Sequence, residues 1–133
     1  METQGIQVYL TVRGGIEAIN WYESTWDAKQ IMLQMADDET RVLHATLEVF
    51  GGQIMLSDEF SEFEKYVTAP PTNGGTSVTV HIYFETREAL DAAEKAAKDG
   101  RAKITMPAAV MPWGAYYGRL VDPFGHSWSF AAE

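Results

Sequence analysis

An internal repeat limits the folds that are open to this chain, and its first copy lies near the N-terminus. The stretch at 5–15 alternates apolar and polar residues, which predicts a strand, and the stretch at 16–26 has the spacing of one helical face. Three further candidate strands follow at 28–36, 42–50 and 53–59. The Gly51-Gly52 pair predicts a tight turn between the last two strands. The first copy is therefore expected to run strand, helix and three strands.

The second copy has the same order. A strand is predicted at 77–85, and a helix at 86–100 begins with Thr86, a residue suited to capping a helix N-terminus. A short strand near 102–105 is followed by a loop rich in Met, Pro, Trp and Gly. The chain then closes with the hairpin sequence "YGRLVDPFGHSWSF" at 117–130. An offset of 73 aligns the copies, pairing Leu47 with Leu120, Gly52 with Gly125 and Met55 with Trp128.

This repeat predicts an α+β fold of two βαβββ modules, which form curved mixed sheets around a cleft. Each sheet would have one face covered by its helix and one bare face, and two bare faces curving towards each other enclose a cleft. We expect a single domain over 1–133, with modules at about 4–60 and 76–132. The stretch at about 61–75 contains Pro70, Pro71, Gly74 and Gly75 and is interpreted as a linker.

Composition excludes several classes of protein. The formal net charge of -9 disfavours nucleic acid as a partner, because an acidic chain repels phosphate backbones. No apolar run is long enough to span a membrane, and the N-terminus has no pattern of a signal peptide. Cysteine is absent, which excludes disulfides and thiolate chemistry. These observations favour a cytoplasmic protein that binds neither membrane nor nucleic acid.

The paired βαβββ order, the stretch "AINWYES" and the closing "WGAYYGRLVDPFGHSW" together resemble one protein family. They are similar to the glyoxalase/bleomycin resistance/dioxygenase superfamily, also called vicinal oxygen chelate proteins, and most similar to its PhnB-like branch. The resemblance implies a cleft-forming fold, a small-molecule ligand of unknown identity and a homodimer. Modules would pair within one chain or between two chains.

The resemblance also implies where a divalent metal would bind in metal-dependent members. Their ligands come from the first and last strands of each module, and the matching positions here are Gln7, Leu56, His81 and Ser129, with Ser57 replacing Leu56 if the register shifts by one. His81 is a strong ligand type and Gln7 a weak one, whereas the carboxylate expected at each last strand is missing. We therefore expect no metal or other cofactor; any metal present would be bound by His81 and Gln7.

The resulting hypothesis is a PhnB-like, non-catalytic protein that binds or sequesters a small molecule and retains a degenerate metal site. The alternative is a metal-dependent lyase, isomerase or dioxygenase of the same superfamily that recruits a nonstandard ligand such as Glu85 or Asp58. Whether the protein is an enzyme stays open, and no catalytic residue is assigned.

Seven residues form the predicted ligand site: Gln7, Tyr9, His81, Tyr83, Trp113, Arg119 and Ser129. Arg119 would hold a carboxylate or phosphonate, or else pair with Asp122 or another acid. Trp113 would form a wall of the cleft or pack at a dimer seam. Asp122 is interpreted as a turn residue, because it begins the Asp-Pro-Phe-Gly turn, and His126 as the residue that closes this turn.

Overall fold

The computed structural model describes residues 1–133, and the chain divides into two compact units. The first comprises Met1–Glu23 and Asp27–Ala69, and the second comprises Ser24–Trp26 and Pro70–Glu133. No helix has both the length and the apolar character needed to cross a membrane. The predicted linker at about 61–75 is shared between the units, because residues up to Ala69 group with the first.

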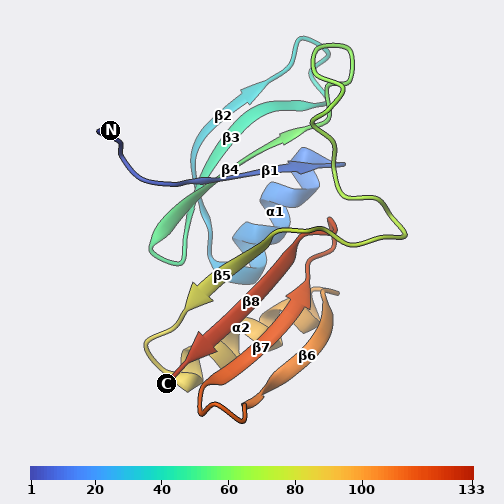
Figure 1. The fold of residues 1–133 in the computed structure, drawn as a ribbon. Coiled ribbons are helices and arrows are strands. Elements are labelled where there is room, and N and C mark those ends of the chain that lie inside the picture. The colour runs from blue at the N-terminus through green and yellow to red at the C-terminus, as the bar shows by residue number, and fades with distance from the viewer. The chain divides into compact units, whose positions relative to one another are not determined.

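The first unit contains one four-stranded sheet with the order β1-β4-β3-β2 (Figure 1). Its strands pair antiparallel except for β1 and β4, which are parallel. Its elements are β1 (Val8–Val12), α1 (Gly15–Trp26), β2 (Lys29–Met35), β3 (Val42–Val49) and β4 (Gly52–Asp58). The last residues of α1, Ser24–Trp26, group with the second unit. The parallel pairing of β1 and β4 closes the β-α-β-β-β unit, because the last strand returns beside the first.

The second unit repeats this topology with the order β5-β8-β7-β6, and β5 and β8 form its parallel pair (Figure 1). Its elements are β5 (Thr79–Tyr83), α2 (Arg87–Asp99), β6 (Lys103–Val110), β7 (Tyr116–Val121) and β8 (Ser127–Ala132). The predicted α+β class and the two βαβββ modules are therefore confirmed. Whether the two sheets enclose a cleft stays a prediction.

Each sheet has a buried face and an open face, because successive side chains of a strand point to opposite sides. On the buried face of the first sheet lie Leu10, Leu47 and Leu56, all at most 4% exposed. In the second sheet, Trp128 and Phe130 are buried, and Val80 and Ile82 of β5 pair with them. The second core also includes Trp26, whose ring lies 4.8 Å from that of Trp128 and whose indole N–H donates to Ala93 O (3.1 Å).

Two element boundaries in the first unit differ from the sequence-based prediction. β1 begins at Val8, and Ile6, which continues the apolar alternation, is fully exposed outside the sheet. The β3–β4 turn is made by Phe50 and Gly51, both at positive φ (52° and 73°), so Gly52 is already the first residue of β4. Alternation alone did not locate either boundary, because both depend on which residues find a partner strand.

β6 is longer than the short strand predicted near 102–105. It continues through Pro107 to Val110, with register irregularities between Ile104 and Met106 and between Met106 and Ala109. Because β6 is an edge strand, a proline can be accommodated there without breaking a ladder on both sides. Pro107 therefore does not end the strand, although proline in a sequence usually indicates a strand end.

Candidate functional site

The open face of the second sheet brings together predicted site residues from two strands. His81 of β5 pairs with Ser129 of β8, and the His81 Nδ1 and Ser129 Oγ atoms are 2.7 Å apart. Tyr83 lies on the same face, two residues further along β5, and is 62% exposed. His81 is also exposed, and its hydrogen bond to the protein is made by Nδ1, so the Nε2 atom is available to a ligand.

Arg119 of β7 lies beside this pair, since it is the register partner of Ser129. Its guanidinium donates to three hydroxyl groups: Tyr117 Oη (2.8 Å), Thr79 Oγ1 (2.7 Å) and Ser127 Oγ (3.2 Å). No carboxylate lies within 4.0 Å, so the predicted pairing with Asp122 or another acid is wrong. Of the five guanidinium N–H groups, one on Nε and one on Nη1 have no protein acceptor.

Aromatic side chains surround Tyr117, whose hydroxyl accepts a hydrogen bond from Arg119. The Tyr117 ring stacks near the His81 ring, with centroids 6.3 Å apart and planes inclined by 25°. The Trp113 ring is 6.3 Å from Tyr117, and Trp113 is 70% exposed. We call the set His81, Tyr83, Trp113, Tyr117, Arg119 and Ser129, with Thr79 and Ser127, the second-sheet site. It presents a cationic group among hydroxyls and aromatic rings, with no acid.

Asp122 is a structural residue of the β7–β8 turn. Its Oδ1 atom accepts from the backbone N–H groups of Phe124 (2.9 Å) and His126 (3.0 Å), and Gly125 takes the positive φ of 94° that the turn requires. Its Oδ2 atom accepts from the indole N–H of buried Trp128 (2.8 Å). The interpretation of Asp122 as a turn residue is therefore confirmed, and the bond to Trp128 is an addition that the sequence did not indicate.

Helix α2 is tied to the neighbouring strands by two of its carboxylates. Asp91 accepts a hydrogen bond from the hydroxyl of Tyr116 (2.5 Å), which raises the pKa of Tyr116 to about 12. Glu94 accepts from the backbone N–H of Ala108 (2.8 Å) on β6. Both carboxylates are therefore used to hold the second unit together.

The open face of the first sheet forms a pocket of its own, which sequence analysis missed. This first-sheet pocket has a volume of about 400 Å³ and is lined by Tyr9, Thr11, Ser57, Asp58, Phe60, Glu64 and Val67. Three of these residues come from the segment at 60–67, which follows β4 and was interpreted as the end of a module and part of a linker. The Pro- and Gly-rich residues that follow this segment, at 70–75, are typical of a linker, so the sequence did not indicate that the segment borders the sheet.

The predicted site residues of the first unit lie at this sheet. Tyr9 is half-exposed and lines the pocket, and its hydroxyl is 2.8 Å from His44 Nδ1. Gln7 is exposed and precedes β1. Leu56 is fully buried and pairs with Leu10, so the 73-residue offset placed the wrong residue on the open face. Ser57, which the one-residue shift selects, lies on the open face beside Thr11.

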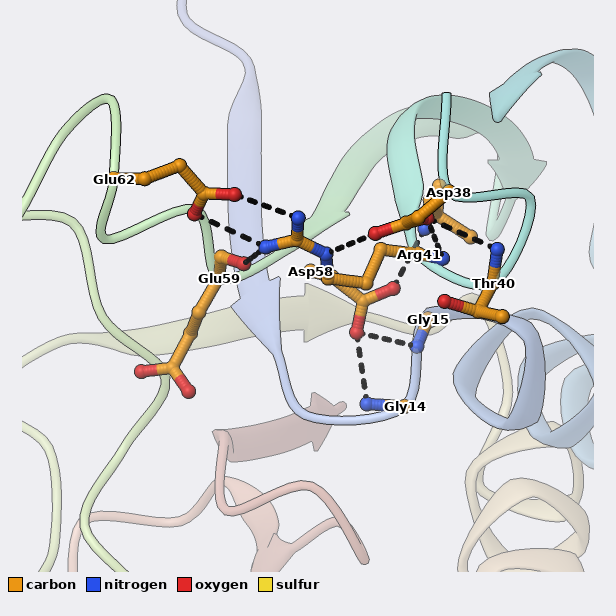
Figure 2. A network of polar contacts seen from close by, with 9 residues as sticks. Gly14, Gly15, Asp38, Thr40, Arg41, Asp58, Glu59 and Glu62 are labelled. Atoms are coloured by element: carbon orange, nitrogen blue, oxygen red, sulfur yellow. Dashed lines mark hydrogen bonds and ion pairs between the residues drawn. The ribbon is translucent and has the colours of Figure 1, made fainter. Parts of the chain in front are cut away.

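Asp58 at the end of β4 fixes the start of α1 (Figure 2). Its Oδ1 atom accepts from Gly14 N (2.9 Å) and Gly15 N (3.0 Å), and its Oδ2 atom accepts from Val42 N (2.7 Å). A Cβ atom at Gly15 would lie 2.6 Å from Asp58 Oδ2, so this close approach requires glycine. Since three backbone donors occupy its carboxylate, Asp58 is a poor candidate for the nonstandard metal ligand of the alternative hypothesis.

Arg41 connects the β2–β3 loop to the segment that borders the pocket (Figure 2). It pairs with Asp38 (2.7 Å) and Glu62 (2.6 Å), donates to Glu59 O (3.2 Å) and lies 4.3 Å from the Phe60 ring centroid. The hydrogen bonds that Arg41 donates to Glu62 and then to Asp38 raise the pKa of Arg41. Hydrogen bonds from Arg41 lower the pKa of Glu62, and backbone and side-chain hydrogen bonds from Arg41 lower that of Asp38.

The residues present do not match a divalent metal site. The chain contains no group of three or more His, Cys, Asp or Glu side chains that could hold a metal ion. His81 has a neutral serine as its neighbour, and catalytic metal sites of zinc type normally use three protein ligands. The expectation that no cofactor is needed stays a prediction.

Comparisons with known proteins agree with this architecture. Residues 7–130 match the model of the Glyoxalase/Bleomycin resistance protein/Dioxygenase superfamily. The chain belongs to this superfamily. It is 31% identical over 122 residues to Uncharacterized protein Mb0911c of Mycobacterium bovis, which covers 91% of this chain and 78% of that protein. The resemblance that the closing motif indicated is confirmed at the level of the superfamily.

Several solved structures share the fold of this chain at low sequence identity. A PhnB protein from Bacillus cereus, described as a putative 3-demethylubiquinone-9 3-methyltransferase, has a TM-score of 0.76 and 24% identity. The match covers 98% of the present chain and 100% of the Bacillus chain. TioX from Micromonospora sp. ML1 has a TM-score of 0.70 and 22% identity, and the match covers 98% of the present chain and 96% of TioX. The fosfomycin resistance protein FosX from Listeria monocytogenes, solved with Mn(II) and sulfate, has a TM-score of 0.72 and 11% identity. The match covers 100% of the present chain and 94% of FosX.

Proposed function

We propose that this protein is a non-catalytic small-molecule binding or sequestering protein, and that its second-sheet site binds an anionic group of the ligand. The observation that carries the proposal is the Arg119 guanidinium, which is half-buried and contacts only neutral hydroxyls. A charge at such a position normally has a counter-ion, because desolvating an uncompensated charge is costly. A carboxylate, phosphonate or sulfate group would supply that counter-ion.

The neighbouring residues favour an anion that carries an aromatic or apolar body. Tyr117 bonds the guanidinium through its hydroxyl, and the His81 and Trp113 rings lie next to Tyr117. The two guanidinium N–H groups without a protein acceptor are available to ligand oxygens. The Nε2 atom of His81 can donate to the same anion when it carries the proton. The homodimer and the cytoplasmic location expected from the sequence remain predictions beside this proposal.

Binding of phenylphosphonate and benzoate tests the proposal directly. Titration calorimetry of the wild type should show binding that weakens about tenfold or more in Arg119→Gln, because a charge-assisted hydrogen bond is removed. Arg119→Lys should retain part of the affinity, and Arg101→Gln is the charge-matched control on an exposed loop position of the same unit. Equal affinity of the wild type and Arg119→Gln would contradict the proposal, as would no binding of either probe at millimolar concentration.

Metal analysis separates this proposal from the metal-dependent alternative. Protein purified without a chelator should contain no stoichiometric Ni, Zn, Fe or Mn, since the donors around His81 are neutral and few. A stoichiometric metal that is lost in His81→Ala would overturn the non-catalytic proposal and favour a lyase, isomerase or dioxygenase.

A further inference from the structure

The first-sheet pocket has an electrostatic character opposite to that of the second-sheet site. The first unit contains 12 Asp and Glu residues and 4 Lys and Arg residues, a formal net charge of -8. The second unit contains 7 acidic and 6 basic residues, a net charge of -1. Nearly all of the excess negative charge therefore lies in the unit that contains the pocket, which favours positively charged ligands there.

Among the four acids at 58–64, the exposed Glu64 is the one that has neither an ion pair nor more than one hydrogen-bond donor. Asp58 accepts three backbone N–H groups, Glu59 pairs with Arg13 (3.1 Å) and Glu62 pairs with Arg41 (2.6 Å). Glu64 lines the pocket and accepts only the backbone N–H of Tyr66 (3.0 Å). The nearest cation in sequence, Lys65, lies instead over the Tyr66 ring at 5.4 Å.

The remaining lining suits an apolar body of modest size. Tyr9 and Phe60 supply aromatic surface, and Val67 supplies aliphatic surface. Thr11 of β1 and Ser57 of β4, which pair in the sheet, supply hydroxyl groups. A volume of about 400 Å³ falls within the range of sites for small organic molecules. A metal ion alone does not fit this lining, because Asp58 already accepts three backbone N–H groups and Glu64 is the only other carboxylate.

We propose that the first-sheet pocket is a second binding site, which takes a protonated amine attached to an aromatic or apolar body. The ammonium group would pair with Glu64, and the body would contact Tyr9, Phe60 and Val67. Amines are attracted both to a carboxylate and to aromatic faces, so the two features of the pocket act on the same ligand class. This site goes beyond the proposed anion site and does not depend on Arg119.

Matched probes test the proposal: 2-phenylethylamine, and 2-phenylethanol as its neutral counterpart. Amide chemical shifts of ¹⁵N-labelled protein should change around Tyr9, Ser57 and 60–67 when the amine is added, and the amine should bind at least about fivefold more tightly than the alcohol. Glu64→Gln should abolish this preference, because glutamine keeps the acceptor for Tyr66 N but lacks the charge. Glu88→Gln, an exposed acid of α2, is the charge-matched control and should leave it unchanged.

A second variant tests the cavity rather than the charge. Val67 is half-exposed, so Val67→Trp should fold normally while its larger side chain fills the pocket and weakens binding of both probes. The proposal is overturned if neither probe binds at millimolar concentration, if both bind equally in the wild type, or if Glu64→Gln leaves the amine preference intact. Arg119→Gln should not change amine binding, so failure of this site and failure of the anion site are distinguishable.

Discussion

The two units share one topology but differ in how each begins its helix and in the chemistry of its open sheet face. In the second unit, the helix is capped locally, because Thr86 Oγ1 accepts from Ala89 N (3.1 Å). In the first unit, the N-cap residue is Gly14, which has no side chain, and the carboxylate of Asp58 accepts the N–H groups of Gly14 and Gly15 from 44 and 43 residues away. The first helix start therefore depends on the completed sheet, and the second does not.

The open faces differ in the sign of their uncompensated charge. The second sheet has Arg119 bonded to hydroxyls, whereas the segment at 60–67 brings Glu64 to the pocket on the open face of the first sheet. Two units with one topology place their side chains at equivalent positions, but the charge and polarity of those side chains can differ. Residues on the open face of a sheet can change without changing the core. The difference between the units is thus the part of this protein in which function is expected to reside.

Removal of the long-range cap should have the largest effect. Asp58→Ala leaves the N–H groups of Gly14, Gly15 and Val42 without their acceptor, which should lower the free energy of unfolding by about 3 kcal/mol or more. Urea denaturation measures this change, and Asp37→Ala, which removes an exposed acid in the same unit, is the control. A loss of less than about 1 kcal/mol for Asp58→Ala would contradict a capping role of this size.

Removal of the local cap should have a smaller effect. Thr86→Ala deletes one side-chain acceptor at an exposed helix start, so we expect a loss of about 1 kcal/mol in the free energy of unfolding. Thr86→Ser keeps the hydroxyl and should remain close to the wild type in the same urea experiment. The contrast between local and long-range capping fails if Thr86→Ala costs as much as Asp58→Ala, or if the Ser and Ala variants are equally stable.

The smallest effect is expected for the ion pairs of Arg41, because their members are exposed to solvent. Arg41→Gln should increase hydrogen exchange several-fold at residues 60–67, since these contacts connect that segment to the β2–β3 loop, and should leave the second unit unchanged. Lys29→Gln, at an exposed position of the edge strand β2, is the control. Protection that is identical in Arg41→Gln and the wild type would exclude this role.

The same contacts predict a direction of pH dependence. Because Arg41 lowers the pKa of Glu62 below its ordinary 4.5, this contribution is present above that value and is lost as the pH falls through the lowered pKa of the folded protein. Amide shifts at 60–67 should therefore titrate with a midpoint below 4.5 in the wild type. In Arg41→Gln the midpoint should move upward, and an unchanged midpoint would argue against the coupling.

Much of the second unit was predictable, because its signals are local. Thr86 marks the helix start, alternation around His81 separates the two strand faces, and Asp122 with Gly125 marks the turn. The first unit was less predictable at the corresponding points. Leu56 was placed on the wrong face, since a sequence offset carries no information on register when the β3–β4 turn starts at Phe50 rather than Gly51.

By itself, the sequence determined the class of fold, the order of elements and the superfamily, because strand alternation, helix spacing and turn residues act over short distances. Which polar side chains find a partner depends on the tertiary structure. Asp58 accepts three backbone N–H groups, and Arg119 donates only to hydroxyl groups. Glu64 has no ion pair, whereas the nearby Glu59 and Glu62 are each paired with an arginine. These outcomes depend on contacts between distant residues, and the charge of a residue in the sequence does not reveal its partner in the fold.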